Sequence, residues 1–282
     1  MTLEYFFSPK TVQKMAYSLL WASAAVVILP IVLIIGIMFY KGFTALNLGM
    51  FSTGSEGLVA PIAGTVLLVA LTALVSAPLG IASAIYLNEY ASKGPLVSTI
   101  RLAIINLAGV PSVVYGLFGL AVFVMLMKLD RCLLAGALTL ALLILPVIIR
   151  TAEEALRTVP LELRQGSWAL GATKWQTIRR IVLPNAFPGI ITGMILSIGR
   201  AAGETAPILF TAAFFSLTDP YPDSLLDPIL VLPYNLYVMA TEAPDVSEEM
   251  KWATALVLVL LVLGLNLGAI VVRARLRRTH RW

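Results

Sequence analysis

Two charged residues, Arg200 and Glu204, stand inside an apolar stretch, residues 189–213, that is long enough to cross a membrane. A charge at membrane depth costs roughly 2.5–3.5 kcal/mol on insertion scales, so the two residues need a partner or a function. Their i, i+4 spacing places them on one helix face, where they can pair. Arginine stays charged, and its planar fork matches a tetrahedral oxyanion. The spacing predicts either an anion contact in a membrane pathway or a static clamp between helices.

The composition indicates an integral membrane protein. The chain has 282 residues, of which 59% are hydrophobic and 12% are charged, whereas about a quarter of a soluble domain is charged. A single cysteine, Cys132, cannot form an intramolecular disulfide. A single histidine, His280, is too few for a histidine-based metal site or catalytic triad. The first uncharged run is longer than the apolar core of a signal peptide, so we expect a spanning helix there.

Uncharged runs predict an all-α protein with six transmembrane helices, at 15–40, 57–88, 102–127, 132–149, 187–217 and 252–272. Six crossings place both termini on one side. With cytoplasmic termini, 15 of the 20 Lys and Arg residues lie inside and 4 lie outside, with Arg200 in the membrane. The positive-inside rule therefore predicts cytoplasmic termini. We divide the chain into an N-terminal part (1–57), a transmembrane domain (58–272) and a basic cytoplasmic tail (273–282).

Proline and glycine interrupt the second and third predicted spans, at Pro78, Gly80 and Pro111 among others. Proline removes a helix hydrogen bond, which is tolerated in lipid only where neighbouring helices or a cavity satisfy the freed carbonyl. These residues indicate either packing kinks or a bend that lines a pore.

The longest inside connection, 150–186, alternates short helical patches with helix breakers. We expect Pro160 to begin a short helix and Gly171 to end it. Thr173 can cap the next helix, which we expect to end at Pro184.

One side of the first short helix carries Leu161, Arg164 or Gln165, and Trp168. A connection of this length with its own helices is usually functional. The alternative is a helix lying on the membrane surface, with Trp168 and Trp175 among the lipid headgroups.

This connection resembles the coupling loop of the permeases of binding-protein-dependent ABC importers, E-A-A-x-x-x-G, nine residues, then I-x-L-P. The glycine, isoleucine, leucine and proline of that pattern fall on Gly171, Ile181, Leu183 and Pro184, and the E-A-A positions hold Gln165, Gly166 and Ser167. The resemblance implies that the loop docks into a groove on a cytoplasmic ATPase. The residues expected at this contact are Leu161, Arg164, Gln165, Gly166, Ser167, Trp168, Gly171, Ile181, Leu183 and Pro184.

Three further stretches narrow the family: G-E-T-A-P at 203–207 with Arg200 upstream, G-V-P-S-V-V-Y-G-L-F at 109–118, and Y-L-N-E-Y at 86–90. Together they resemble the permease subunits of phosphate ABC importers, from about residue 58 to the C-terminus. The resemblance implies a type I ABC importer permease fold in a prokaryotic cytoplasmic membrane. It also implies a second homologous permease, two ATPase subunits and an extracytoplasmic phosphate-binding protein as partners.

The same resemblance implies that this chain is a transport subunit and not itself an enzyme. No cofactor is expected on it, because ATP and Mg²⁺ belong to the partner ATPase. The stretch 166–173 superficially resembles a phosphate-binding loop, but Ala172 stands where that loop needs lysine.

The substrate pathway is expected at Arg200, Glu204 and Arg150. Glu204 can neutralise Arg200 between transport events, and it can accept a hydrogen bond from a protonated phosphate, which sulfate does not offer. Arg150 either snorkels to the interface or contacts the anion at the exit. The acidic external loop, 218–251, is either a solvated lid or a docking surface for the binding protein.

Other functions stay open at this point. The same architecture could import sulfate or molybdate, and an ATP-independent anion channel or carrier would need no ATPase-docking loop. An intramembrane enzyme is disfavoured, because the predicted spans contain neither the Ser/Lys nor the paired-Asp arrangement that such an enzyme needs. The basic tail indicates contact with anionic membrane lipid and not with nucleic acid.

Overall fold

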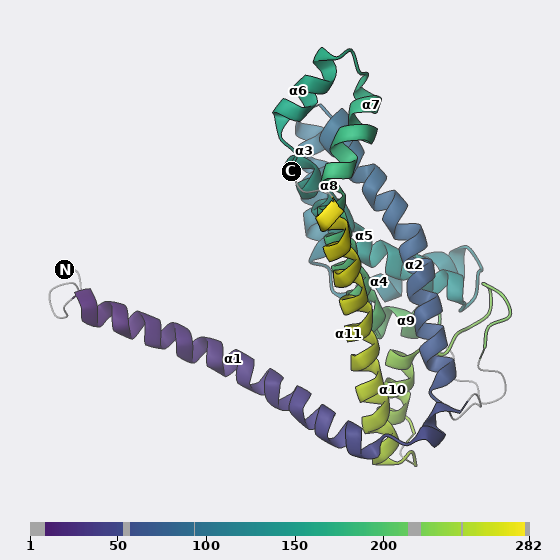
Figure 1. Ribbon diagram of the computed structural model, residues 1–282. Helices are drawn as coiled ribbons and strands as arrows, with labels where there is room; N and C mark the ends of the chain where they lie inside the picture. Colours follow the sequence, from purple (N-terminus) through teal and green to yellow (C-terminus); the bar gives the residue numbers. More distant parts are fainter. Residues whose placement is uncertain (1–8, 53–56, 93, 214–220, 244, 280–282) are drawn as a thin grey trace.

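Helices account for nearly all of the residues that the computed structural model describes, which are 9–52, 57–92, 94–213, 221–243 and 245–279 (Figure 1). Within these ranges one isolated β-bridge joins Ala213 to Ile229. The helices are α1 (Pro9–Ala45), α2 (Val59–Ile85), α3 (Pro95–Ala108), α4 (Ser112–Gly119), α5 (Leu133–Arg157), α6 (Leu161–Ala169), α7 (Lys174–Thr177), α8 (Leu183–Gly203), α9 (Ala206–Thr211), α10 (Leu232–Thr241) and α11 (Glu248–Thr279). A 3₁₀ turn spans Leu48–Phe51, and π-helical turns span Tyr86–Tyr90, Leu120–Leu126 and Ile178–Val182.

Five helical stretches are long and apolar enough to cross a membrane: Lys10–Ala45, Val59–Tyr90, Leu133–Arg157, Lys174–Gly203 and Glu248–Arg275. They correspond to five of the six predicted spans. The end of the predicted fifth span, 214–217, lies outside the described residues, as do residues 1–8 and 280–282 of the predicted terminal segments.

The predicted third span is not one straight helix. Pro95–Ala108 and Ser112–Leu126 are bent by 101° at a break between them. Pro111 holds an extended backbone there, with ψ 139°, and it cannot donate to the preceding turn. A bend this sharp is larger than a packing kink, so the bend that Pro111 indicated is confirmed, whereas its lining a pore stays a prediction. Counted together, the bent pair brings the candidate spans to six.

Helix α5 forms the centre of the bundle, between α2 on one side and α8 on the other. At the end nearer α6, its Ile149, Ala152 and Leu156 pack in one core with residues of α2 and α8. At the other end, Leu133 and Leu140 pack with Ile208 of α9. Because α5 belongs to both cores, it connects the two ends of the bundle, and α8 packs against it in the core nearer α6.

Small residues let α8 approach its neighbours closely, as is typical of packed membrane helices. A Cβ at Gly193 would overlap the Thr151 side chain of α5, and one at Gly199 would overlap Asn266 of α11. At Gly203, by contrast, a Cβ would meet no described heavy atom within 4 Å. Gly193 and Gly199 are therefore packing glycines, and Gly203 is not.

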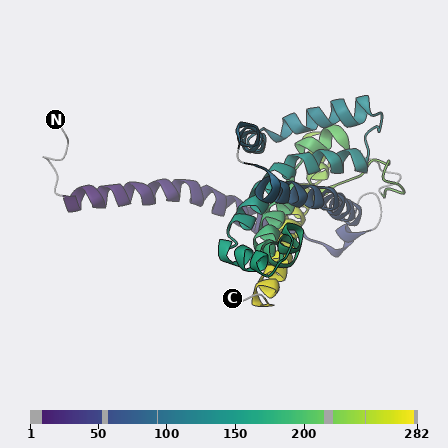
Figure 2. The same cartoon turned by 90° about the horizontal axis from the view of Figure 1, so that it is seen from above.

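Helix α1 leaves the bundle, in both views of the molecule (Figures 1 and 2). Its contact with the rest of the chain is mainly with α11, where Gly42 lies against Leu256 and Lys41 stacks over the ring of Trp252 at 4.7 Å. The apolar window of this span is unburied within the chain. Lipid or another subunit must therefore cover α1.

Candidate functional site

Arg200 and Glu204 form the ion pair that their spacing predicts. Arg200 Nε donates to Glu204 Oε1 over 3.1 Å, and their side chains are 43% and 15% exposed. The expectation that one helix carries both residues was wrong. Helix α8 ends at Gly203, and Glu204 has an extended backbone, with φ −75° and ψ 134°. Arg200 therefore lies in the last turn of α8, and Glu204 lies at the start of a helix break.

Helix α4 packs against the break that follows α8. The chain becomes helical again in the short helix α9, which begins after Thr205. Gly116 of α4 packs on this junction between α8 and α9. A Cβ at Gly116 would come within 2.9 Å of the Pro207 Cα and 3.1 Å of the Ala206 carbonyl oxygen. Only glycine allows this approach without a shift, so the α8–α9 break is held by the helix that follows the α3–α4 elbow.

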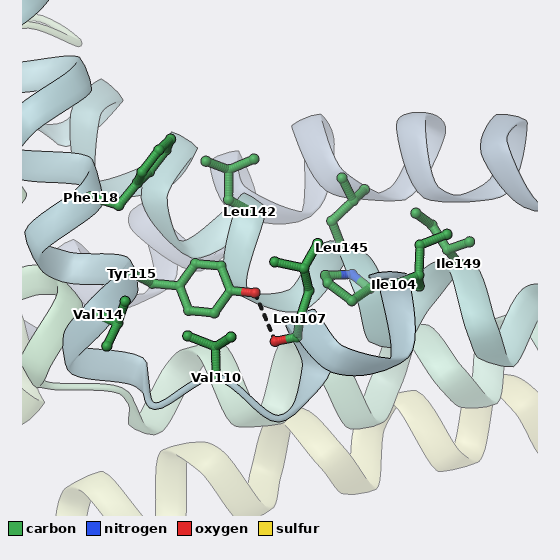
Figure 3. Close-up of a pocket in the computed structure, with 10 residues that line it drawn as sticks. Ile104, Leu107, Val110, Val114, Tyr115, Phe118, Leu142, Leu145 and Ile149 are labelled. Carbon is green, nitrogen blue, oxygen red and sulfur yellow. Dashed lines mark hydrogen bonds between the residues drawn. The ribbon is translucent and has the colours of Figure 1, made fainter. Parts of the chain in front are cut away.

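An apolar cavity of about 490 Å³ lies between the two arms of the elbow and α5 (Figure 3). Tyr115 points into it from α4, and its hydroxyl donates to the Leu107 carbonyl oxygen of α3 over 2.9 Å. This bond joins the two sides of the break and satisfies a carbonyl near the end of α3. The proline and glycine of the third span indicated a bend, but their spacing did not predict a cavity.

Arg150 does not join the Arg200–Glu204 pair. It binds Glu154 on its own helix, with Nε and Oε1 3.2 Å apart. Thr151 packs on Gly193, seven residues before Arg200, so Arg150 lies about 10 Å along the bundle from Arg200 at 1.5 Å per residue. A separate small cavity brings Arg150 together with Arg101 and Arg157, two arginines that the sequence did not single out.

The predicted helix signals of the 150–186 connection are mostly confirmed. Pro160 directly precedes α6. Gly171 follows its end with φ +79°, and its N–H binds the Trp168 carbonyl, as expected of a glycine after a helix C-terminus. Thr173 caps α7 in a reciprocal capping box with Gln176.

The predicted end at Pro184 was wrong. The π-helical turn Ile178–Val182 carries the helix directly into α8, where Pro184 lies in the first turn. Pro184, which has no N–H to donate, closely follows this π-helical turn, where the regular i→i−4 hydrogen-bond pattern is already interrupted. The connection and the ion-pair helix are therefore one continuous element from Lys174 to Gly203.

The predicted coupling residues lie on two sides of α6. On one side Leu161 is 56% exposed and Trp168 is 47% exposed. On the other side Gly166 and Ser167, together with Ile181, line a surface cavity of about 440 Å³. Large apolar residues that the sequence did not predict as contacts, Leu163, Leu170 and Trp175, are exposed in the same segment. The segment has the apolar and aromatic character of a docking site.

Arg164 is held inside the chain, unlike its exposed neighbours Leu161 and Trp168. Its guanidinium binds Glu89 in an ion pair of 2.5 Å and donates to the Leu156 carbonyl oxygen over 2.8 Å. The side chains of Arg164 and Glu89 are only 12% and 7% exposed. Beside them, Lys174 lies 4.9 Å from the Tyr90 ring centre. Arg164 thus ties α6 to the end of α2, and Glu89, which sequence reasoning did not select, is its partner.

With this geometry established, comparison with known proteins identifies the family. Residues 76–281 match the family described as binding-protein-dependent transport system inner membrane component. The chain is a permease of this family. Among curated relatives, the permease is similar to the phosphate transport system permease protein PstA 1 of Mycobacterium tuberculosis, at 33% identity over 98% of this chain and 93% of the relative.

Other relatives agree with this placement. The phosphate transport system permease protein PstA of Yersinia pestis is 38% identical over 83% of this permease and 81% of its own length. A probable ABC transporter permease protein of Bacillus subtilis, YqgI, is 32% identical over 92% and 94%.

Solved structures show the same fold at low sequence identity. A chain of a bacterial ABC transporter that imports the acidic polysaccharide alginate matches with a TM-score of 0.67 at 16% identity, over 95% of this permease and 99% of that chain. A chain of the inward-facing MetNI methionine ABC transporter matches with a TM-score of 0.61 at 16% identity, over 82% and 99%. The permease therefore has the type I ABC importer permease fold.

Proposed function

We propose that this permease is a membrane subunit of an ATP-driven importer of inorganic phosphate. The observation that carries the proposal is the likeness, over almost the whole chain, to proteins named phosphate transport system permeases. The described site fits this substrate class, because a guanidinium at membrane depth, 43% exposed within the isolated chain, offers a charged fork to a tetrahedral oxyanion.

In this proposal a second homologous permease completes the pathway beside Arg200. Two ATPase subunits bind ATP and Mg²⁺ at the cytoplasmic face, and an extracytoplasmic phosphate-binding protein delivers the anion. A structural neighbour, the alginate ABC transporter, was solved in complex with its ligand-bound periplasmic protein. The charge distribution along the sequence supports cytoplasmic termini in a prokaryotic cytoplasmic membrane.

Arg200 and Glu204 have complementary roles in the proposed pathway. Glu204 neutralises Arg200 while no anion is present, so the charge is never unpaired at membrane depth. When phosphate arrives, Arg200 binds its oxygens and Glu204 accepts a hydrogen bond from a protonated oxygen. A Glu204→Gln permease should therefore lose preference for phosphate over sulfate. Unchanged discrimination in a variant that still transports would refute this role for Glu204.

The exposed surface around Leu161 and Trp168 is the proposed ATPase contact. Trp168→Ala should weaken association with the ATPase, because exposed aromatic side chains carry much of the energy of such contacts. Trp21, 75% exposed on α1, is the matched control, and Trp21→Ala should leave the association unchanged. Equal effects of the two substitutions would contradict the assignment.

The deciding experiment reconstitutes the permease with its partner permease, the ATPase and the binding protein in liposomes. Uptake of phosphate, sulfate and molybdate is measured with and without ATP. We expect uptake of phosphate that needs both ATP and the binding protein. Selective uptake of sulfate or molybdate would indicate another oxyanion importer, and uptake without ATP would indicate a channel or carrier.

A further inference from the structure

A cavity of about 120 Å³ lies between α3 and the end of α5 that adjoins α6, apart from the Arg200–Glu204 pair. Three arginines and two glutamates line it, so its lining carries one excess positive charge. The polar lining residues are Arg101, Arg150, Arg157, Glu153 and Glu154. The cavity is several times the roughly 30 Å³ that one water molecule occupies in the liquid, which leaves room for a small anion.

The bonds of Arg101 leave one donor unused. Its NH2 group binds Glu153 over 2.8 Å and the Leu87 carbonyl oxygen over 2.9 Å. Its Nε is buried and has no hydrogen-bond partner among the described residues. A buried donor without a partner is rare in folded proteins, because its lost hydration is not replaced. Because Nε itself is covered, an acceptor in the cavity would satisfy it after a small movement of the Arg101 side chain, which lines the cavity.

The carboxylates do not saturate the other two arginines. Glu153 Oε1 is shared between Arg101 and Arg157, and the Arg157 contact is 2.7 Å. Arg150 binds Glu154 through Nε alone among the described partners. Each guanidinium carries five N–H donors in a planar fork. Donors therefore outnumber the acceptors that the described chain supplies, as in sites that bind phosphate oxygens.

The position of the cavity relates it to both parts of the proposed mechanism. Measured along the bundle axis, its Arg150 end is offset from Arg200 by about 10 Å toward α6, by the register of α5 against α8 and a rise of 1.5 Å per residue. Arg101 binds the Leu87 carbonyl oxygen in the π-helical turn that follows α2. The same turn contains Glu89, which pairs with Arg164 of α6. An anion in the cavity would thus lie between the membrane ion pair and the proposed ATPase contact.

We propose that this cavity binds a phosphate oxyanion through Arg101, Arg150 and Arg157. The chemistry fits free inorganic phosphate and also the phosphate of an anionic lipid headgroup. The use of this cavity as the last binding site of imported phosphate rests on the proposed function. The binding of a phosphate group in the cavity does not rest on that function.

The test uses the complete reconstituted transporter with Ile105→Cys, which places a thiol in the cavity lining. The native Cys132 is fully buried and should stay unlabelled, and the partner subunits are prepared as cysteine-free variants. A water-soluble maleimide is applied from the cytoplasmic side in phosphatidylcholine vesicles. Inorganic phosphate should slow labelling of the Ile105→Cys transporter, and potassium chloride at equal ionic strength should not. A Ser98→Cys transporter, with its thiol on the same helix outside the cavity lining, is the matched control and should label equally fast in both salts.

Arg101→Lys keeps the positive charge but removes the unpartnered Nε donor. It should raise the phosphate concentration that gives half protection by about tenfold, as expected for losing one charge-assisted hydrogen bond. Arg179→Lys, an exposed change on the same side, should not alter it. If the cysteine variant fails to assemble, binding of radiolabelled phosphate to the Arg101→Lys and Arg179→Lys transporters gives the same comparison.

A separate arm of the experiment tests whether a lipid headgroup supplies the phosphate. If vesicles with phosphatidylglycerol slow labelling without added phosphate, and free phosphate adds nothing, the site holds a headgroup phosphate. No protection in either arm, or equal protection with Arg101→Lys, would overturn the proposal. Phosphate uptake is measured in parallel. Uptake without protection refutes the cavity alone, whereas protection without uptake refutes the proposed transport function alone.

Discussion

Glu89 and Arg164 offer the sharpest test of how α6 is attached to the bundle. We consider Glu89→Met, which keeps the length of the side chain and removes its acceptors. Arg164, 12% exposed, would keep only its bond to the Leu156 carbonyl. Removing one partner of a buried ion pair costs about 3–5 kcal/mol, and we expect about 3 kcal/mol because that carbonyl bond remains.

A double variant separates the buried charge from the shape of the site. In Glu89→Met with Arg164→Met, both charges are absent, so most of the lost stability should return. The matched control is Glu248→Met, which breaks the exposed Glu248–Lys251 pair, whose glutamate side chain is 74% exposed. Exposed pairs contribute only about 0–1 kcal/mol, so this control should barely change stability.

The assay is denaturant unfolding of the purified transporter in detergent, together with phosphate uptake per ATP hydrolysed in liposomes. Glu89→Met should lower both the free energy of unfolding and the transport ratio, because α6 loses its attachment to α2. If Glu89→Met behaves like Glu248→Met in both measurements, the pair does not hold the coupling segment in place.

Two further predictions concern the close packing of α8 and the hydrogen bond across the α3–α4 elbow. Gly193→Val should prevent assembly, because its side chain would overlap Thr151, whereas Gly203→Ala should be tolerated, since nothing described lies within 4 Å of its Cβ position. Expression and gel filtration of the two variants check this. An assembled Gly193→Val permease would contradict it. Tyr115→Phe removes the bond to Leu107 across the elbow and should cost about 1 kcal/mol, measured by thermal unfolding; an unchanged midpoint would show that the bond does not stabilise the elbow.

Local sequence signals predicted the parts of the structure that depend on neighbouring residues. The i, i+4 spacing of Arg200 and Glu204 predicted their ion pair. Gly171 and Thr173 predicted the end of α6 and the cap of α7, because a positive φ and a capping box each involve only a few adjacent residues. The six-span prediction also depended on local hydropathy, and the candidate spans agree with it.

Changes in helix direction, and contacts between residues far apart in the sequence, could not be predicted from such local signals. The run 102–127 is equally apolar whether it is straight or bent by 101°, so hydropathy cannot report the elbow. Glu89 and Arg164 are 75 residues apart in sequence, and nothing in their own neighbourhoods predicts their contact. Gly116 of α4 packs against Ala206 and Pro207, just beyond the end of α8 at Gly203, and sequence periodicity does not describe this contact either.

Phosphate transport through Arg200 is tested most directly by ATP-dependent uptake of radiolabelled phosphate into liposomes that contain the complete transporter with Arg200→Ala. The change leaves the packing glycine Gly199 in place, and Arg200 is partly exposed, so the variant should assemble and bind its ATPase. We predict that it hydrolyses ATP but takes up almost no phosphate. Uptake at the wild-type rate would contradict the claim that Arg200 contacts phosphate in the pathway.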